Sequence, residues 1–478
     1  MLRACLCPLL LMAIALLRGG SAGAMRPLSE QRSGSSQPRE AHFTVGPYLQ
    51  DVRTDGIVVV WETDVPALGM VRLDLPGRRT AFLSPPGTHH EVRLSGLRPG
   101  TRYRYVVAIR PAPLGGAGRG REEVPGIERR SEPAEFVTAT ARGPFTFLVY
   151  GDNRDRDADH AQVIRAMLPE APDFILQTGD MVGNAGDEHQ WRRFFATAAP
   201  LLRSAPMYPA LGNHELRGDP DASRFYRFFV LPGGENPRNR VVYYSFRYSN
   251  ALFVALDGNS PYDNGQAEWL EHTLRAGSSD EHIRHIFVFL HQPPYAVGAY
   301  CGSERMQRRL VPLFSRYRVR AVFGGHEHAY QHLERDGVRY FISGGGGAPL
   351  YPRSQPCTAA DRRALRLFRA EHHYLRVRVR GDEAVLTAIS KTGQVMEQVQ
   401  LHQPVLPHLE EREEEERVAQ APEPSPLLRT AVALPLAAAI GTAVAVAMFL
   451  LLRRLRPPRR RDLLPGGEPP PRNRQARR

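Results

Sequence analysis

This sequence of 478 residues lacks several common functional signals. It has one lysine, Lys391, so arginine carries almost all of its positive charge. Its middle part has no basic stripe with interleaved aromatic residues, which argues against a nucleic-acid-binding protein. The four-glycine run Gly344 to Gly347 is not followed by the Lys-Ser/Thr of a phosphate-binding loop, so a nucleoside-triphosphate site is not indicated. There is no internal repeat.

The length and the 42% hydrophobic content predict two globular domains with terminal segments. Residues 1–24 are typical of a signal peptide, because an early arginine and an apolar stretch precede the small-x-small pattern Ala22-Gly23-Ala24. Residues 25–41, rich in Ser, Arg, Gln and Glu, predict a flexible lead-in.

The C-terminal part predicts a single membrane anchor. Residues 430–452 are small or apolar and are long enough to cross a hydrocarbon layer of about 30 Å as a helix. The arginine-rich residues 453–478 follow at once, which predicts a cytoplasmic tail and periplasmic or extracellular domains at the cell membrane. The Pro-rich, acidic residues 403–429 between domain and helix indicate a solvated stalk.

The net charge of +13 is concentrated at the ends of the chain. Residues 453–478 hold ten arginines and two acidic residues, a net charge of +8, and Arg3 and Arg18 add two more, which leaves +3 for everything between. The basic isoelectric point therefore reflects the tail, which can lie against anionic lipid.

Only two cysteines, Cys301 and Cys357, remain after the predicted signal peptide. A lone pair in an oxidising compartment is more often a disulfide than two free thiols, so we expect a bridge that braces two loops. Two unpaired loop cysteines are the alternative.

Residues 42–138 predict an antiparallel β-sandwich, because short segments of alternating polarity are separated by turn residues. These segments are 57–63, 70–73, 91–94 and 103–107. The run from Leu97 to Thr101, followed by Tyr103 and Tyr105, resembles the fibronectin type III pattern, in which a tyrosine locks a strand-end corner.

Residues 144–402 predict a mixed α/β domain, because strands alternate with segments of helical periodicity. The expected helices are 159–168, 188–202, 265–275 and 304–317. The last two strands, 374–379 and 384–390, have no helix between them and predict an antiparallel hairpin.

Five polar clusters in this domain each follow an apolar run that is typical of a buried strand. The clusters are Gly151-Asp152-Asn153-Arg154, Gly179-Asp180, Gly212-Asn213-His214-Glu215, His291 and Gly325-His326-Glu327-His328. Because open α/β sheets place their sites at strand ends, carboxylate, amide and imidazole groups are expected to meet there. This combination points to metal-assisted hydrolysis.

Together the five clusters resemble the calcineurin-like metallophosphoesterase superfamily and, with the β-sandwich in front, purple acid phosphatases. The resemblance implies a four-layer αββα catalytic sandwich and two Fe, Zn or Mn ions. Asp180 would bridge the ions, Asp152 and His328 would bind the first, and the second would be held by Asn213, His291 and His326. Oxygen and imidazole donors suit all three metals.

The resemblance also implies hydrolysis of a phosphate ester. The ions would clamp the phosphate and supply a hydroxide nucleophile, His214 would protonate the leaving alkoxide, and Glu215 would orient His214. The alternative is an adhesion or receptor ectodomain that binds a ligand through a degenerate phosphatase fold. Monoester or diester preference and oligomeric state stay open.

The first metal lacks one ligand of either family pattern. Arg154 stands where the wider superfamily has histidine, and Gly183 stands where purple acid phosphatases have a tyrosine. Water or substrate can occupy the missing ligand position, the side chain of Asn153 or Asp155 can move to occupy it, or the first ion can bind weakly.

Two further residues are candidates for contact with substrate. Arg154 can make planar bidentate contacts to phosphate, with an ion pair to Asp155 as its alternative role. Tyr295, in the loop after His291, lines the pocket or packs in the interior.

Overall fold

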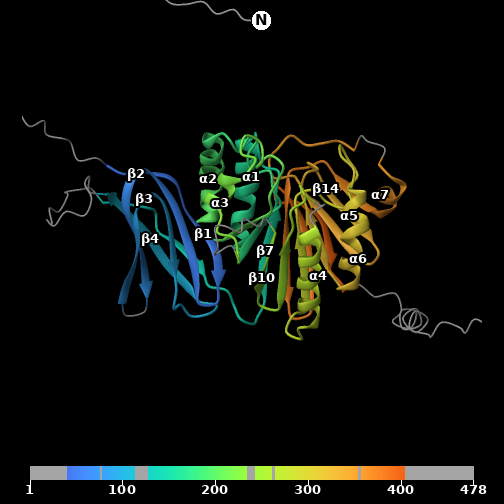
Figure 1. Cartoon of the computed structure of the whole chain (residues 1–478), viewed down its shortest axis with the longest axis horizontal. Helices are drawn as coiled ribbons and strands as arrows, with labels where there is room; N and C mark the ends of the chain where they lie inside the picture. Colours follow the sequence, from blue (N-terminus) through green and yellow to red (C-terminus); the bar gives the residue numbers. More distant parts are fainter. Residues whose placement is uncertain are drawn as a thin grey trace, which may run out of the picture. The chain divides into compact units, whose positions relative to one another are not determined.

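The computed structural model describes residues 40–75, 78–112, 128–233, 243–260, 264–353 and 357–403, which belong to one compact unit (Figure 1). The predicted signal peptide, the lead-in up to residue 39, the stalk from residue 404, the membrane span and the tail lie outside these ranges. Within them, no helix is long and apolar enough to cross a membrane.

The first domain is an antiparallel β-structure. Its strands are β1 (Phe43–Arg53), β2 (Gly56–Leu75), β3 (Arg78–Leu94), β4 (Arg102–Pro111), β5 (Arg129–Arg130) and β6 (Ala134–Val137). The first half of β2 pairs with β1 and with the end of β3, whereas its second half pairs with the start of β3 and with β4. The long strand β2 therefore has β1 beside its first half and β4 beside its second half.

The change from β1 to β4 falls where the β2–β3 register is interrupted, between Glu62 and Ala67. Pro66 lies in this interval and has no N–H to give to a ladder, so regular pairing stops there. The segments predicted as separate strands, 57–63 and 70–73, thus belong to one bent strand, which corrects the sequence prediction. The Tyr103 hydroxyl accepts a hydrogen bond of 2.8 Å from the Arg98 N–H, which is the expected tyrosine corner and confirms a fibronectin III-like domain.

The second domain contains two sheets in the described residues. One has the order β19-β18-β17-β7-β8-β9 and the other β10-β11-β12-β13-β15-β14-β16. The strands are β7 (Phe145–Tyr150), β8 (Phe174–Gln177), β9 (Met207–Pro209), β10 (Tyr244–Tyr248), β11 (Ala251–Ala255), β12 (His285–Phe289), β13 (Ala321–Gly324), β14 (Tyr330–Arg335), β15 (Val338–Ser343), β16 (Leu365–Arg369), β17 (His373–Arg380), β18 (Glu383–Ser390) and β19 (Val395–Gln400). The antiparallel pairing of β17 with β18 confirms the predicted hairpin.

The helices cover the outer faces of the two sheets. They are α1 (Asp157–Met167), the 3₁₀ turn η1 (Leu168–Glu170), α2 (Glu188–Leu202), α3 (Ser223–Phe228), α4 (Asn264–Ser279), α5 (Glu304–Arg309), α6 (Val311–Arg316) and α7 (Ala359–Ala364). The single helix expected over 304–317 is split at Leu310, because Pro312 in the first turn of α6 cannot continue the hydrogen bonds of α5.

The core between the sheets is aromatic. The Phe147 ring lies 5.1 Å from Phe253, 5.3 Å from Phe287 and 5.9 Å from Phe323, so β7 of one sheet faces β11, β12 and β13 of the other. Alternate residues of β11 and β12 point outward and share a second cluster with α4, α5 and α6. Helix, sheet, sheet and helix thus form the expected αββα layers (Figure 1).

His160 on α1 makes a testable contribution to acid stability. It is 1% exposed, its ring stacks with Tyr150 and Phe194, and burial lowers its pKa from 6.5 to about 3. The unfolded chain binds a proton below pH 6.5 that the folded chain does not take up until about pH 3, so stability is lost as pH falls through this window. We expect His160→Phe to remove on the order of 2 kcal/mol of the stability loss between pH 7 and pH 4.

Denaturant unfolding at both pH values measures this effect. The matched control is His189→Gln, because His189 is exposed. A His160→Phe variant that loses stability on acidification as steeply as the wild type contradicts the expectation.

Candidate metal centre

The predicted ligands come together because their strands are parallel and end at one edge. β7, β8 and β9 run parallel in one sheet, and β11, β12 and β13 run parallel in the other. The residues that follow their carboxyl ends are Asp152 after β7, Asp180 after β8, Asn213 after β9, His291 after β12, and His326 and His328 after β13. The two facing sheets bring these ends to the same place.

The backbone is strained at three of these residues. Asp152, Asp180 and His326 have φ values of 56°, 57° and 69°, in the left-handed region that side chains other than glycine rarely adopt. Such conformations persist where the surrounding structure fixes them, and they gather at functional sites. At Gly212 a Cβ atom would lie 2.3 Å from the Asp180 nitrogen, so only glycine allows this approach.

Four side chains converge in the half of the site assigned to the second ion. His291 Nε2 lies 3.2 Å from Asp180 Oδ1, 3.0 Å from Asn213 Oδ1 and 3.3 Å from His326 Nδ1. His291 Nδ1 lies 2.8 Å from the Thr178 carbonyl, to which it donates, so Nε2 of the neutral ring carries a lone pair. Acceptor atoms then face one another in a buried place, which suits a cation.

The half assigned to the first ion holds Asp152, Asp180 and His328, whose candidate ligand atoms all lie within 4.8 Å of one another. His328 donates from Nδ1 to the Pro349 carbonyl at 2.7 Å, which leaves Nε2 facing Asp152 Oδ1 at 3.5 Å. All three side chains are buried. Both halves therefore fit metal ions, and the oxygen and imidazole donors suit Fe, Zn or Mn alike.

The carboxylates make the site attractive to cations. Burial lowers the pKa of His291, but the charges of Asp180 and Asp152 overcome this and raise it to about 9. Burial also raises the pKa of Asp180, and His291 reverses this so that the pKa is well below its usual value. A proton or a metal ion is thus drawn to the same point, and the two compete for it.

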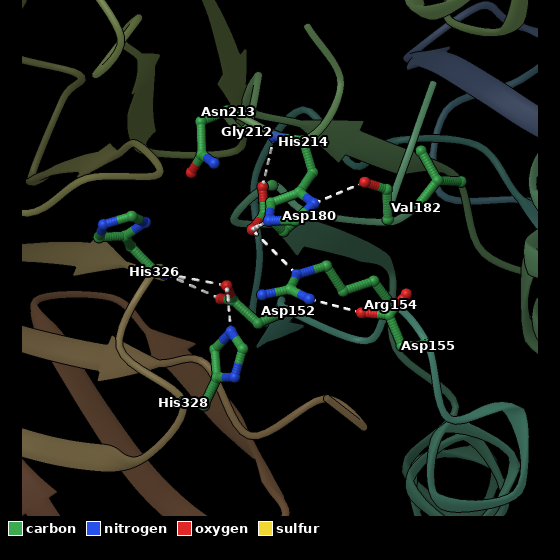
Figure 2. Close-up of polar contacts among 12 residues, drawn as sticks. Asp152, Arg154, Asp155, Asp180, Val182, Gly212, Asn213, His214, His326 and His328 are labelled. Atoms are coloured by element: carbon green, nitrogen blue, oxygen red, sulfur yellow. Dashed lines mark hydrogen bonds and ion pairs between the residues drawn. The ribbon is translucent and has the colours of Figure 1, made fainter. Parts of the chain in front are cut away.

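Arg154 lies between Asp155 and Asp180 in the site (Figure 2). Its guanidinium is hydrogen-bonded to Asp155, and its Nε lies 3.4 Å from Asp180 Oδ2. Burial lowers the pKa of Arg154, and the charges of Asp180 and Asp155 raise it above its usual value. The ion pair with Asp155, one of the two roles predicted for Arg154, is present, and the cation also reaches the shared carboxylate.

His214 has a fixed orientation beside Asp180 (Figure 2). Its Nδ1 donates to the Gly183 carbonyl at 2.7 Å, and its Nε2 lies 3.7 Å from Asp180 Oδ2. Burial lowers its pKa although Asp180 raises it. The ring therefore presents Nε2 to the cavity.

Glu215 has a different place from the one expected beside the His214 ring. Its buried carboxylate accepts hydrogen bonds from the N–H groups of Asp180 at 2.8 Å, Met181 at 2.9 Å and Gly212 at 2.9 Å. Glu215 thus fixes the backbone on which Asp180 stands, and the Gly183 carbonyl orients His214. Sequence proximity alone suggested the wrong partner.

A cavity of about 120 Å³ opens over these residues. It is lined by Arg154, Asp180, Asn213, His214, Arg217, Tyr300, His326, His328 and Tyr351. Tyr295 is not among them, because it is 4% exposed and packs 5.0 Å from the Tyr340 ring in the interior. The packed role is therefore the correct one of the two predicted for Tyr295.

Three lining residues were missed in the sequence: Arg217, Tyr300 and Tyr351. Arg217 lies only two residues after Glu215, so proximity to the third cluster was an available signal. Tyr300 and Tyr351 come from loops whose course a sequence pattern does not reveal. The expected disulfide joins these loops through Cys301 and Cys357, with a Cα–Cα distance of 5.4 Å.

Comparison with known proteins agrees with this site. Residues 145–330 match the calcineurin-like phosphoesterase family model. Purple acid phosphatase 21 of Arabidopsis thaliana is 27% identical over 266 residues, 53% of this chain and 55% of that protein. A purple acid phosphatase of Glycine max is 24% identical over 355 residues, 68% of this chain and 72% of that protein.

A solved structure supports the fold. The purple acid phosphatase PPD1 from yellow lupin (Lupinus luteus) seeds matches with a TM-score of 0.62 and 18% identity, over 76% of this chain and 74% of that chain. Residues 145–330 thus resemble calcineurin-like phosphoesterases, and the proteins to which this chain is similar include purple acid phosphatases. The chain spans only about half the length of the first of these relatives.

Proposed function

We propose that this protein hydrolyses phosphate esters with the help of metal ions. The observation that carries the proposal is the convergence of Asp180, Asn213 and His326 on the lone pair of His291, next to the buried cluster of Asp152, Asp180 and His328. The calcineurin-like phosphoesterase domain supports a hydrolase. A binuclear centre is the arrangement that the donor set and the homologues suggest.

The metal ions would polarise the phosphoryl oxygens and lower the pKa of a coordinated water. The protein's own contribution is to hold the metal-binding side chains in a fixed orientation. Asp180 belongs to both halves of the site, and Glu215 fixes its backbone by accepting hydrogen bonds from the N–H groups of Asp180, Met181, Val182 and Gly212. Thr178 and Pro349 set the orientation of the two imidazoles His291 and His328.

His214 is the proposed general acid. Its Nδ1 proton is committed to the Gly183 carbonyl, so a second proton on Nε2 is the one that points to the cavity. Burial lowers the pKa of His214 and favours the neutral ring, whereas the charge of Asp180 acts in the opposite direction and favours the protonated form. Transfer of that proton to the departing oxygen lets an alkoxide leave as an alcohol.

Two arginines are proposed to bind the phosphate oxygens. Arg217 lines the cavity, is exposed, and forms no ion pair with the residues that the structure describes. Arg154 lines the same cavity but already neutralises Asp155 and reaches Asp180. Arg217 is therefore the cation more available to an incoming dianion, whereas Arg154 also shapes the first half-site.

The place of Arg154 predicts unequal metal sites. Its positive charge lies 3.4 Å from the carboxylate that both halves share, where it opposes binding of a first ion that already lacks one ligand. We expect Arg154→His to supply the missing imidazole and to remove the fixed charge. The first-site dissociation constant should fall at least about tenfold.

Elemental analysis after dialysis against a weak chelator measures this change. The wild type is expected to keep about one ion per chain, and Arg154→His about two. Arg217→His is the matched control, because it changes the other arginine of the cavity away from the first half-site. Equal metal content in all three proteins would remove the role proposed for Arg154.

The cellular setting is also a proposal. A disulfide at the rim of the site fits an oxidising compartment. Together with the signal peptide and anchor expected from the sequence, it supports a single-pass protein with its catalytic domain outside the cytoplasm.

Hydrolysis of p-nitrophenyl phosphate and bis(p-nitrophenyl) phosphate by the full chain tests the proposed function. Turnover of at least one ester in the presence of Mn, Fe or Zn is expected, and the ratio of the two rates assigns monoester or diester preference. If neither ester is turned over with any of these metals, the ectodomain with a degenerate phosphatase site is the better account.

A further inference from the structure

Two tyrosines form an aromatic wall at the mouth of the cavity. The Tyr300 ring lies 4.6 Å from the His326 ring, and the Tyr351 ring stacks on His328 at 3.9 Å and 14°. The two tyrosine rings are 6.1 Å apart at 66°. Each tyrosine thus covers one imidazole of the metal centre, and the pair stands edge to face along one side of the cavity.

This wall is held in place from several directions. Cys301, the neighbour of Tyr300, is bonded to Cys357 in the loop that follows Tyr351. The Glu327 carboxylate accepts hydrogen bonds from the N–H groups of Ala299 and Tyr300. Tyr351 donates its N–H to the His328 carbonyl at 3.0 Å. The rings are therefore positioned before any substrate arrives, which reduces the entropy lost on binding.

Tyr300 keeps much of its surface in contact with solvent. It is 50% exposed, although most large apolar side chains near the site are buried. The cavity of about 120 Å³ has room for a phosphate group, but the alcohol part of an ester has to extend through the mouth. That part meets the free surface of Tyr300, and planar rings pack on tyrosine in offset or edge-to-face geometry.

We infer that Tyr300 and Tyr351 form a specificity site for phosphate esters whose alcohol carries a planar aromatic ring, an inference that rests on the proposed hydrolytic function. Tyr300 is the specificity-determining residue, because its ring is free to contact the substrate. Tyr351 is the positioning residue, because its ring is stacked on His328. Arg154 and Arg217 would bind the phosphate group, and the tyrosine pair would contact the ring of the alcohol.

Benzyl phosphate and cyclohexylmethyl phosphate test this inference. Both release a primary alcohol of similar size, so the comparison isolates the planar ring from the chemistry of the leaving group. We expect the wild type to prefer benzyl phosphate by about 2- to 10-fold in kcat/KM, the range of one aromatic contact. The preference should fall to about 1 in Tyr300→Leu and persist in Tyr300→Phe, and it should appear in KM more than in kcat.

The outcomes separate this inference from the proposed function. Hydrolysis of both esters by the wild type at equal kcat/KM overturns the aromatic site and leaves the hydrolase intact. A preference that survives in Tyr300→Leu also overturns it. If neither ester is hydrolysed but p-nitrophenyl phosphate or bis(p-nitrophenyl) phosphate is, the specificity site is overturned and the proposed function stands. If none of the four esters is hydrolysed with any metal, the proposed function fails and the specificity site fails with it.

Discussion

Replacing Asp180 with asparagine is expected to lower kcat/KM for phosphate-ester hydrolysis by about a thousandfold or more, because it removes the one carboxylate that both halves of the site share. Oδ1 of Asp180 faces His291, while Oδ2 faces Arg154 and His214. Asparagine keeps the shape of the side chain but has no charge to hold two cations. Bound metal should therefore fall together with turnover.

Asp221→Asn is the matched control, because Asp221 is an exposed aspartate just beyond the third polar cluster. It is expected to keep both turnover and metal. Circular dichroism should show that Asp180→Asn is folded, because Glu215 can still accept hydrogen bonds from the backbone N–H groups of residues 180 and 181. If Asp180→Asn keeps full metal content and turnover within tenfold of the wild type, the metal centre is not where the structure brings its ligands together.

Replacing His214 with alanine should have an effect that depends on the leaving group. Benzyl phosphate loses an alkoxide that needs a proton, so its kcat should fall about 100- to 10,000-fold, the usual contribution of a general acid. p-Nitrophenyl phosphate releases a stable phenolate, so its kcat should fall much less. The difference between the two losses measures proton donation and not the stability of the fold.

His214→Gln serves as the comparison for His214→Ala, because glutamine can keep a hydrogen bond to the Gly183 carbonyl but cannot act as an acid near neutral pH. The two variants should show the same dependence on the leaving group. Equal losses for both esters, or recovery in His214→Gln, would assign His214 a positioning role.

Much of the fold could be predicted because short segments of the sequence carry the pattern of a single strand or helix. The apolar runs before the first and last polar clusters predicted β7 and β13, and the amphipathic pattern of residues 188–202 predicted α2 to the residue. Their polar ends predicted the ligands, since parallel strands deliver their last residues to one edge. Continuity across Pro66 and the break before Pro312 were harder to predict, because a proline only limits pairing, and tertiary packing decides whether a strand bends or a helix ends.

The rim of the site could not be predicted in the same way. Tyr300 and Tyr351 owe their places to loops that meet only in the folded domain, where a disulfide joins the loops and the buried Glu327 accepts hydrogen bonds from the backbone at Tyr300. Tyr295 was a candidate because it follows His291 in sequence, but its ring lies in the core. Loop residues near a site in sequence are therefore weaker predictions than strand-end residues.

The most direct measurement is the recovery of activity when metal is returned to the chelated full-length protein. Turnover of p-nitrophenyl phosphate is measured against ions bound per chain, for Mn, Fe and Zn in turn. The expected result is no turnover in the metal-free protein and a rate that rises with bound ion in the wild type but not in Asp180→Asn. Turnover in the metal-free protein equal to that of the loaded protein would contradict a metal-dependent phosphoesterase.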